Sequence, residues 1–206
     1  MYKLRTFEIA LIFGVVFALL AGRGVAAEQQ ELADSMIRLH VIANSDSAED
    51  QEDKLAVRDA VLKLVEGYGM QADSVSEMER ILRDHLPELE AAGERVLRAR
   101  NTAYGVRASV TDCYFPTKVY PGFALPAGTY TALRVEIGEG DGANWWCVAF
   151  PPLCVGSCTE NVEQAVEAGF FTREQGEFLA GYEDGYILKF RCMELLGQLK
   201  RAVFQG

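Results

Sequence analysis

Five cysteines and two histidines are the side chains of this sequence whose chemistry could extend beyond packing. They are Cys113, Cys147, Cys154, Cys158 and Cys192, with His40 and His85. A zinc site needs closely spaced ligands. Cys147, Cys154 and Cys158 follow one another at intervals of seven and four residues, without a CxxC or HxxxH pair. The set therefore predicts no metal site and no other cofactor.

Catalysis by a thiol would require a base beside one of the cysteines to generate the thiolate. His85 falls on the apolar face of a predicted helix, where a packing role is expected. His40 lies on a predicted strand and can face either side of it. An exported thiol-dependent hydrolase that uses one cysteine and His40 therefore stays open as an alternative function.

Cys147 and Cys154 flank the reversal at Pro151-Pro152, which can bring two thiols together. A disulfide requires Cα atoms closer than about 7 Å. Spacing alone does not establish that distance, and the other interpretation is a pair of buried free thiols. An odd number of cysteines leaves at least one unpaired within the chain.

Other common catalytic and phosphate-binding motifs are absent from the sequence. It contains no GxGxxG, no GxxxxGK[ST] and no GxSxG. The acidic stretch 46–53 lacks the ligand order and central glycine of an EF-hand, and helix capping explains it. These observations favour a binding or signalling module over an enzyme.

The amino-terminal segment has the pattern of a secretory signal. Lys3 and Arg5 precede 14 uncharged residues, 9–22, which is shorter than the roughly 20 apolar residues of a membrane-spanning helix. Small residues follow up to Ala27, so we expect residues 1–27 to be a signal peptide cleaved after Ala27. An uncleaved anchor is the alternative. The protein is thus expected to act outside its compartment of synthesis.

Charge and length limit what the exported part can be. The chain of 206 residues is half hydrophobic and carries a formal net charge of −10. Such a surface repels nucleic acid, and no basic run favours an anionic membrane surface, so membrane contact is expected only through the signal segment or a receptor. Residues 28–206 are long enough to fold as one domain without metal or disulfide bonds.

Hydrophobic periodicity predicts a mixture of helices and strands. A strand is expected at 37–42, a helix at 48–66 capped by Ser47, and a helical stretch from Ser74 or Ser76 to about Arg100 that Pro87 kinks or splits. The later elements are strands at 106–111, 131–137 and 145–150, helices at 160–168 and 172–180, a strand at 186–190 and a helix at 193–204. The predicted fold class is α+β: a single domain with a small mixed or antiparallel sheet packed against helices.

Trp145 and Trp146 are adjacent on a predicted strand. Successive strand residues point to opposite faces, so only one of the two can enter a given apolar layer. The other needs a second layer, a ligand or a partner.

Two long stretches resemble one known family. They are IRLHVIANSDSAEDQE from Ile37, followed by KLAVRDAVL from Lys54, and LPAGTYTALRVEIGEGDGANWWCVAFPPLC from Leu125 to Cys154. Together they are similar to stage II sporulation protein R of endospore-forming bacteria. The later Lys189-Phe190-Arg191 with Glu194 resembles the basic-aromatic segment near the end of that family.

The resemblance implies a sporulation signal made in the forespore and exported into the space between forespore and mother cell. There it would activate a membrane-embedded aspartic protease of the mother cell, which processes the precursor of sigma factor E. Residues at motif positions are the candidates for contact with the outward-facing part of that protease: Arg38, His40, Asn44, Asp46, Arg58, Asp59, Trp145 and Trp146. Asn44 and Asp46 can instead close a turn, and Arg58 and Asp59 can be ordinary helix-surface charges.

Overall fold

The computed structural model describes residues 8–13, 29–153 and 158–180. The strand predicted at 186–190, the helix at 193–204 and most of the signal segment lie outside the described residues. Residues 8–13 are helical, and residues 29–34 form a short helix that precedes the first strand. Among the described residues, no helix has the length and apolar character needed to span a bilayer.

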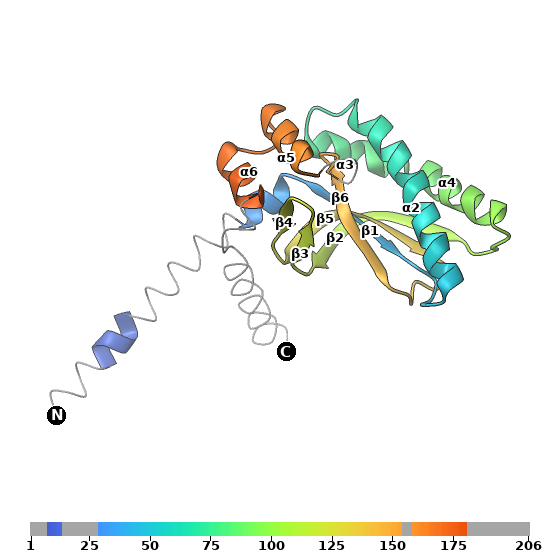
Figure 1. Ribbon diagram of the computed structural model, residues 1–206, viewed down its shortest axis with the longest axis horizontal. Helices are drawn as coiled ribbons and strands as arrows, with labels where there is room; N and C mark the ends of the chain where they lie inside the picture. Colours follow the sequence, from blue (N-terminus) through green and yellow to red (C-terminus); the bar gives the residue numbers. More distant parts are fainter. Residues whose placement is uncertain (1–7, 14–28, 154–157, 181–206) are drawn as a thin grey trace.

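Four strands form one mixed sheet in the order β2-β5-β1-β6 (Figure 1). Their bounds are Ile37–Ile42 for β1, Val106–Phe115 for β2, Gly128–Ile137 for β5 and Asn144–Phe150 for β6. Strand β1 is parallel to β5 and antiparallel to β6, and β2 is antiparallel to β5. The α+β prediction with a mixed sheet is confirmed, and β6 is an edge strand of this sheet.

Three helices cover one face of the sheet (Figure 1). They are α2 (Ala48–Gly69), α3 (Val75–Asp84) and α4 (Leu86–Ala99), and the side chains of Ser47 and Ser74 accept the backbone N–H groups that begin α2 and α3. Alternate residues of all four strands pack against them in one apolar core, as the alternation predicts. Pro87 does divide the predicted long helix, since α4 begins with this residue in its first turn.

A second core lies on part of the opposite face. It is covered by the short hairpin of β3 (Lys118–Tyr120) and β4 (Phe123–Leu125), and by α5 (Cys158–Glu167) and α6 (Arg173–Ala180). The hairpin lies within a segment that the proline and glycine content predicts to be a loop, and its strands are too short for a visible alternation. The half of this face toward the carboxyl end of β1 carries polar side chains instead.

Helix α2 is longer than its sequence predicts. Gly67 and Gly69 follow the predicted helix 48–66 and favour an end there, yet the helix continues to Gly69, and Met70 closes it by donating its N–H to the Glu66 carbonyl. Val65 and Tyr68 are buried in the first core. Tertiary packing of these side chains outweighs the weak helix propensity of glycine.

Candidate functional site

The sequence-predicted contact residues gather around the first half of the edge strand β6. Trp145 points to the helix-covered side, and Trp146 points to the open side of the sheet, as the alternation predicts. Asn44 and Asp46 lie at the end of β1, where the loop between β5 and β6 passes. Among the described residues, β6 has a strand neighbour on one side only.

On the helix side, the partly exposed Trp145 contacts Arg58, whose side chain is 18% exposed. The guanidinium carbon of Arg58 lies 4.3 Å from the centroid of the Trp145 ring, and the indole remains 37% exposed. Asp59 holds the same guanidinium at 2.7 Å. A hollow of about 380 Å³ opens here, lined by Arg58, Asp59, Leu62, Lys63, Glu66, Trp145 and Cys147.

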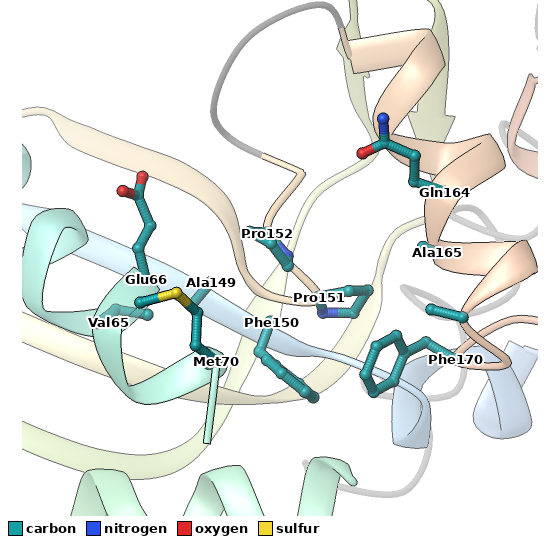
Figure 2. A pocket seen from close by; sticks show the side chains of 12 residues that line it. Val65, Glu66, Met70, Ala149, Phe150, Pro151, Pro152, Gln164, Ala165 and Phe170 are labelled. Carbon is teal, nitrogen blue, oxygen red and sulfur yellow. The ribbon is translucent and has the colours of Figure 1, made fainter. Parts of the chain in front are cut away.

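A second hollow of about 540 Å³ lies further along the same side of α2. Figure 2 shows Met70 and Glu66 on one side of it, Gln164 and Ala165 of α5 on the other, and Phe150 with Pro151 between them. The rings of Phe150 and Phe170 meet edge to face with 4.9 Å between their centroids. Glu66 lines both hollows, so they are neighbours along α2 and the edge strand, and the groove denotes these two hollows.

On the open side, Trp146 lies between an imidazole and an ammonium group. The His40 ring centroid is 6.0 Å from that of Trp146, and the Lys118 nitrogen is 4.2 Å from the Trp146 centroid. The Nε2 atom of His40 lies 2.6 Å from Asn144 Oδ1. Burial lowers the pKa of His40, and the positive charge of Arg134 lowers it further. The imidazole is therefore neutral at physiological pH.

Arg38 departs from its predicted place. The expectation that it lies on the accessible polar side of β1 is wrong, because the side chain is fully buried. Its Nε donates to the Cys147 carbonyl at 2.8 Å and its Nη2 to the Tyr120 hydroxyl at 2.9 Å. The guanidinium carbon lies 4.3 Å and 5.0 Å from the ring centroids of Phe115 and Tyr130. Arg38 thus supports β6 and the hairpin from within.

Asn44 and Asp46 hold two loops together. Asn44 Nδ2 donates to Asp50 Oδ2 at 2.8 Å, while its Oδ1 accepts from the Glu139 N–H. Asp46 Oδ1 accepts from the Ala143 N–H at 2.7 Å. The buried Lys54 donates to the Ala143 carbonyl at 3.0 Å. We term these hydrogen bonds of Asn44, Asp46, Asp50 and Lys54 the lock. The lock fixes the residue that precedes β6, so both predicted contact residues position Asn144 and the tryptophans.

The lock predicts a pH dependence of stability that is centred on Asp50. Hydrogen bonds from Ser45 and then Asn44 lower the pKa of this carboxyl below its ordinary value. A group with a lowered folded-state pKa stabilises the fold above its unfolded pKa of about 3.9 and loses that effect as the pH falls through the folded value. We expect Asp50→Asn to destabilise the protein more at pH 7 than at pH 3 in urea unfolding. An equal difference at both pH values would contradict this role.

Gly138 allows the same lock to close. Its φ of +60° is one that side chains rarely adopt, and an added Cβ would collide with the Asn44 side chain. We expect Gly138→Ala to cost about 1–3 kcal/mol of unfolding free energy, measured by urea denaturation. Gly105→Ala is the matched control, because nothing lies within 4 Å of its added Cβ. A change of about 0.5 kcal/mol or less is expected there. Equal losses of unfolding free energy for the two variants would contradict the role of Gly138 in the lock.

Four buried nitrogen atoms on the open side of the sheet have no hydrogen-bond partner among the described residues. They are Arg38 Nη1, His40 Nδ1, Arg134 Nε and Trp146 Nε1. Leaving such a group unsatisfied costs about 1–3 kcal/mol, and folded proteins contain few of them. Four such groups on one face are unusual for a surface that serves the fold alone.

Neither described cysteine side chain is prepared to act as a nucleophile. Cys147 is disulfide-bonded. Cys113 is free, and burial raises the pKa of its thiol, which disfavours the thiolate. Cys154 lies outside the described residues, so its pairing with Cys147 stays a prediction. The described residues contain no group of three His, Cys, Asp or Glu side chains that could hold a metal ion.

Several residues of the site could not be chosen from sequence. Arg134 and Lys118 are single charges in ordinary surroundings, and only the sheet register and the hairpin bring them to His40 and Trp146. Lys54 sits in a charged helix and is nonetheless buried. The only sign of this burial in the sequence is the place of Lys54 in the first turns of the helix, close to the loop that precedes it.

Comparison with known proteins identifies the family. The family model described as stage II sporulation protein R matches residues 33–160. A relative named stage II sporulation protein R, from Bacillus subtilis (strain 168), is 38% identical over 150 residues, which cover 68% of this chain and 67% of the relative. No solved structure matches the chain. The family match contains β1, the lock, the smaller hollow and the open side of the sheet, and the chain belongs to the stage II sporulation protein R family.

Proposed function

We propose that the protein is an exported sporulation signal that activates a membrane-embedded aspartic protease of the mother cell, and that it does so by docking. Family membership supports a sporulation role. The apolar segment at residues 9–22 behind Lys3 and Arg5 supports export into the space between forespore and mother cell. The disulfide at Cys147 supports the same location, because disulfides persist in oxidising compartments.

The observation that carries the docking proposal is the partly exposed Trp145 and its contact with Arg58 beside the edge strand. Tryptophan and arginine are enriched among the residues that dominate binding energy at protein interfaces. Both line the groove between α2 and β6, and the lock holds the start of β6 in place. A groove with fixed aromatic and charged walls suits the outward-facing part of a receptor.

Docking can activate a protease only if the active form is bound more tightly than the inactive one. A shift from 1% to 99% active requires about 5.5 kcal/mol of differential affinity. An interface centred on β6 can supply this when its residues meet a surface that only the active form, or an active dimer, presents.

A binding assay tests the proposal directly. The exported chain and the purified outward-facing part of the protease are mixed at equal concentrations, and complex formation is followed by analytical ultracentrifugation. A stable complex is expected. Two species that sediment independently at concentrations up to about 100 μM would contradict docking, since a functional interface of ordinary size is tighter than this.

Alkylation separates docking from the alternative of a thiol-dependent hydrolase. Iodoacetamide under non-reducing conditions blocks free thiols and leaves the disulfide of Cys147 intact. A docking signal keeps its ability to activate the protease after this treatment, whereas a thiol enzyme loses all turnover. Circular dichroism of the alkylated protein controls for loss of fold.

A further inference from the structure

The open side of the sheet carries one row of polar side chains across four strands. Ser109 of β2 is paired with Arg134 of β5, Arg134 with His40 of β1, and His40 with Trp146 of β6. Strands are spaced about 4.8 Å apart, so the four side chains form a continuous band across this face. Arg38 lies two residues before His40 on β1 and therefore on the same side of the sheet.

This band contains more hydrogen-bond donors than acceptors. Three N–H groups lack an acceptor among the described residues, namely Arg38 Nη1, Arg134 Nε and Trp146 Nε1. Arg38 is fully buried, and it donates to the Cys147 carbonyl and the Tyr120 hydroxyl, which are uncharged acceptors. His40 Nδ1 is also unpartnered, but in the neutral ring, whose Nε2 donates to Asn144 Oδ1, it is an acceptor and does not add to the donors. An anionic ligand supplies the acceptors that the band lacks.

The charge of this face is opposite to that of the whole protein. Within the described strands, alternation places Arg107 and Arg134 on the open side, above the buried Arg38, with Glu136 as the one carboxylate. Lys118 adds a cation from the hairpin at the Trp146 ring. The chain as a whole has a formal net charge of −10. A local positive surface on such a protein favours an anionic partner at this face.

We propose that the open side of the sheet binds a carboxylate-rich segment of a protein partner, with Arg134, Lys118 and Trp146 as its contact residues. If the proposed function holds, that segment belongs to the outward-facing part of the protease, and the inference rests on that function for the partner's identity. A planar guanidinium matches a carboxylate with two parallel hydrogen bonds, and indole N–H and ammonium groups add further donors.

The geometry favours an acidic protein segment over an anionic membrane. The positive band is confined to one face of the sheet, and the adjoining β5–β6 loop carries the exposed carboxylates of Glu139 and Asp141. A net negative protein is repelled by a negatively charged plane, whereas a chain segment can reach the band alone. Trp145 and Trp146 flank the same strand, so one partner placed along β6 contacts both the groove and the band.

Arg134 is the side chain most able to turn toward a ligand. It is 37% exposed, and Glu136 holds its Nη2 at 2.8 Å. A ligand carboxylate therefore competes with Glu136 for this guanidinium. This competition predicts opposite effects for two neutralising variants: Arg134→Gln weakens binding, whereas Glu136→Gln strengthens it.

A first experiment tests the band without using the protease. The full chain in detergent micelles is titrated with a synthetic hexaglutamate peptide, and the two indole N–H signals are followed by NMR after assignment with Trp146→Phe. The Trp146 signal is expected to shift and the Trp145 signal to stay. Hexalysine is the control peptide. A shift confined to the Trp145 signal overturns the proposal. So does a Trp146 signal that stays unchanged when hexaglutamate is raised to ten times the concentration used for hexalysine.

A second experiment measures affinity for the outward-facing part of the protease. We expect Arg134→Glu and Lys118→Glu each to weaken binding at least 10-fold, and Glu136→Gln to strengthen it about threefold. Arg98→Glu on α4 makes the same charge change on the helix side, where the arginine is 61% exposed, and it should change affinity less than twofold. Unfolding free energies are measured for each variant to exclude loss of fold.

The outcomes separate this inference from the proposed function. If the native chain binds the protease and Arg134→Glu binds equally well, the band is not the contact and docking stands. If the native chain does not bind the protease but hexaglutamate shifts the Trp146 signal, the proposed function fails and the acid-binding band stands. A third outcome overturns the proposal: the native chain binds phosphatidylglycerol vesicles, Arg134→Glu abolishes this binding, and hexaglutamate has no effect. The band is then assigned to lipid.

Discussion

Trp145→Ala is expected to weaken docking to the protease by 10- to 100-fold, which corresponds to about 1.4–2.7 kcal/mol. The indole is 37% exposed, stacks on Arg58 and forms a wall of the groove. Its removal takes away the rigid aromatic surface and frees the guanidinium to move. Affinity for the outward-facing part of the protease is measured by titration, and processing of the sigma precursor is measured beside it.

The matched control for this variant is Tyr104→Ala. Tyr104 is an aromatic residue of almost the same exposure, 39%, and it precedes β2 at the opposite edge of the sheet. Its loss should leave affinity within about twofold, because most residues outside an interface centre contribute little. If Tyr104→Ala weakens binding as much as Trp145→Ala, docking does not use the β6 edge.

Arg38→Ala is expected to lower the free energy of unfolding by about 3–5 kcal/mol. The substitution removes two hydrogen bonds to the Cys147 carbonyl and the Tyr120 hydroxyl, and it empties the space between Phe115 and Tyr130. Burial lowers the pKa of the Arg38 guanidinium because it disfavours the charged form. The measurement is urea unfolding followed by circular dichroism.

Arg38→Met separates packing from charge in the same experiment. Methionine keeps an unbranched apolar chain between the two rings and removes the cost of burying the cation. We expect it to lose less than half as much stability as Arg38→Ala. Arg98→Ala, at an exposed ion pair, should change stability by about 0.5 kcal/mol or less. Equal losses for the alanine and methionine variants would mean that the hydrogen bonds, and not the packing, carry the effect.

Strand alternation and helix capping were sufficient to predict most of the described fold. The strands of the main sheet show a clean two-residue period because one of their faces packs on helices, and Ser47 and Ser74 mark helix starts by their side-chain bonds. The hairpin of β3 and β4 was missed because three-residue strands show no period. The end of α2 was misplaced because the burial of Tyr68, a tertiary effect, decides it.

The candidate site was only partly predictable, for a related reason. Trp145 and Trp146 identify themselves through residue type, and adjacency alone requires them to face apart. Arg38 looks like a surface arginine in the sequence. Strand alternation predicts which face of the sheet it lies on, but it does not predict which element covers that face. The hairpin supplies that cover through Tyr120. Arg134 and Lys118 gain significance only from neighbours that are distant along the chain.

The most direct test of docking without catalysis is a reconstitution with three components. The protease in lipid vesicles, its sigma precursor and the exported chain are combined, and removal of the pro-sequence is followed by gel electrophoresis. We expect cleavage to rise in proportion to the complex formed, and to be absent when the protease is omitted. Cleavage that is unchanged by the exported chain, or that persists without the protease, would contradict the account.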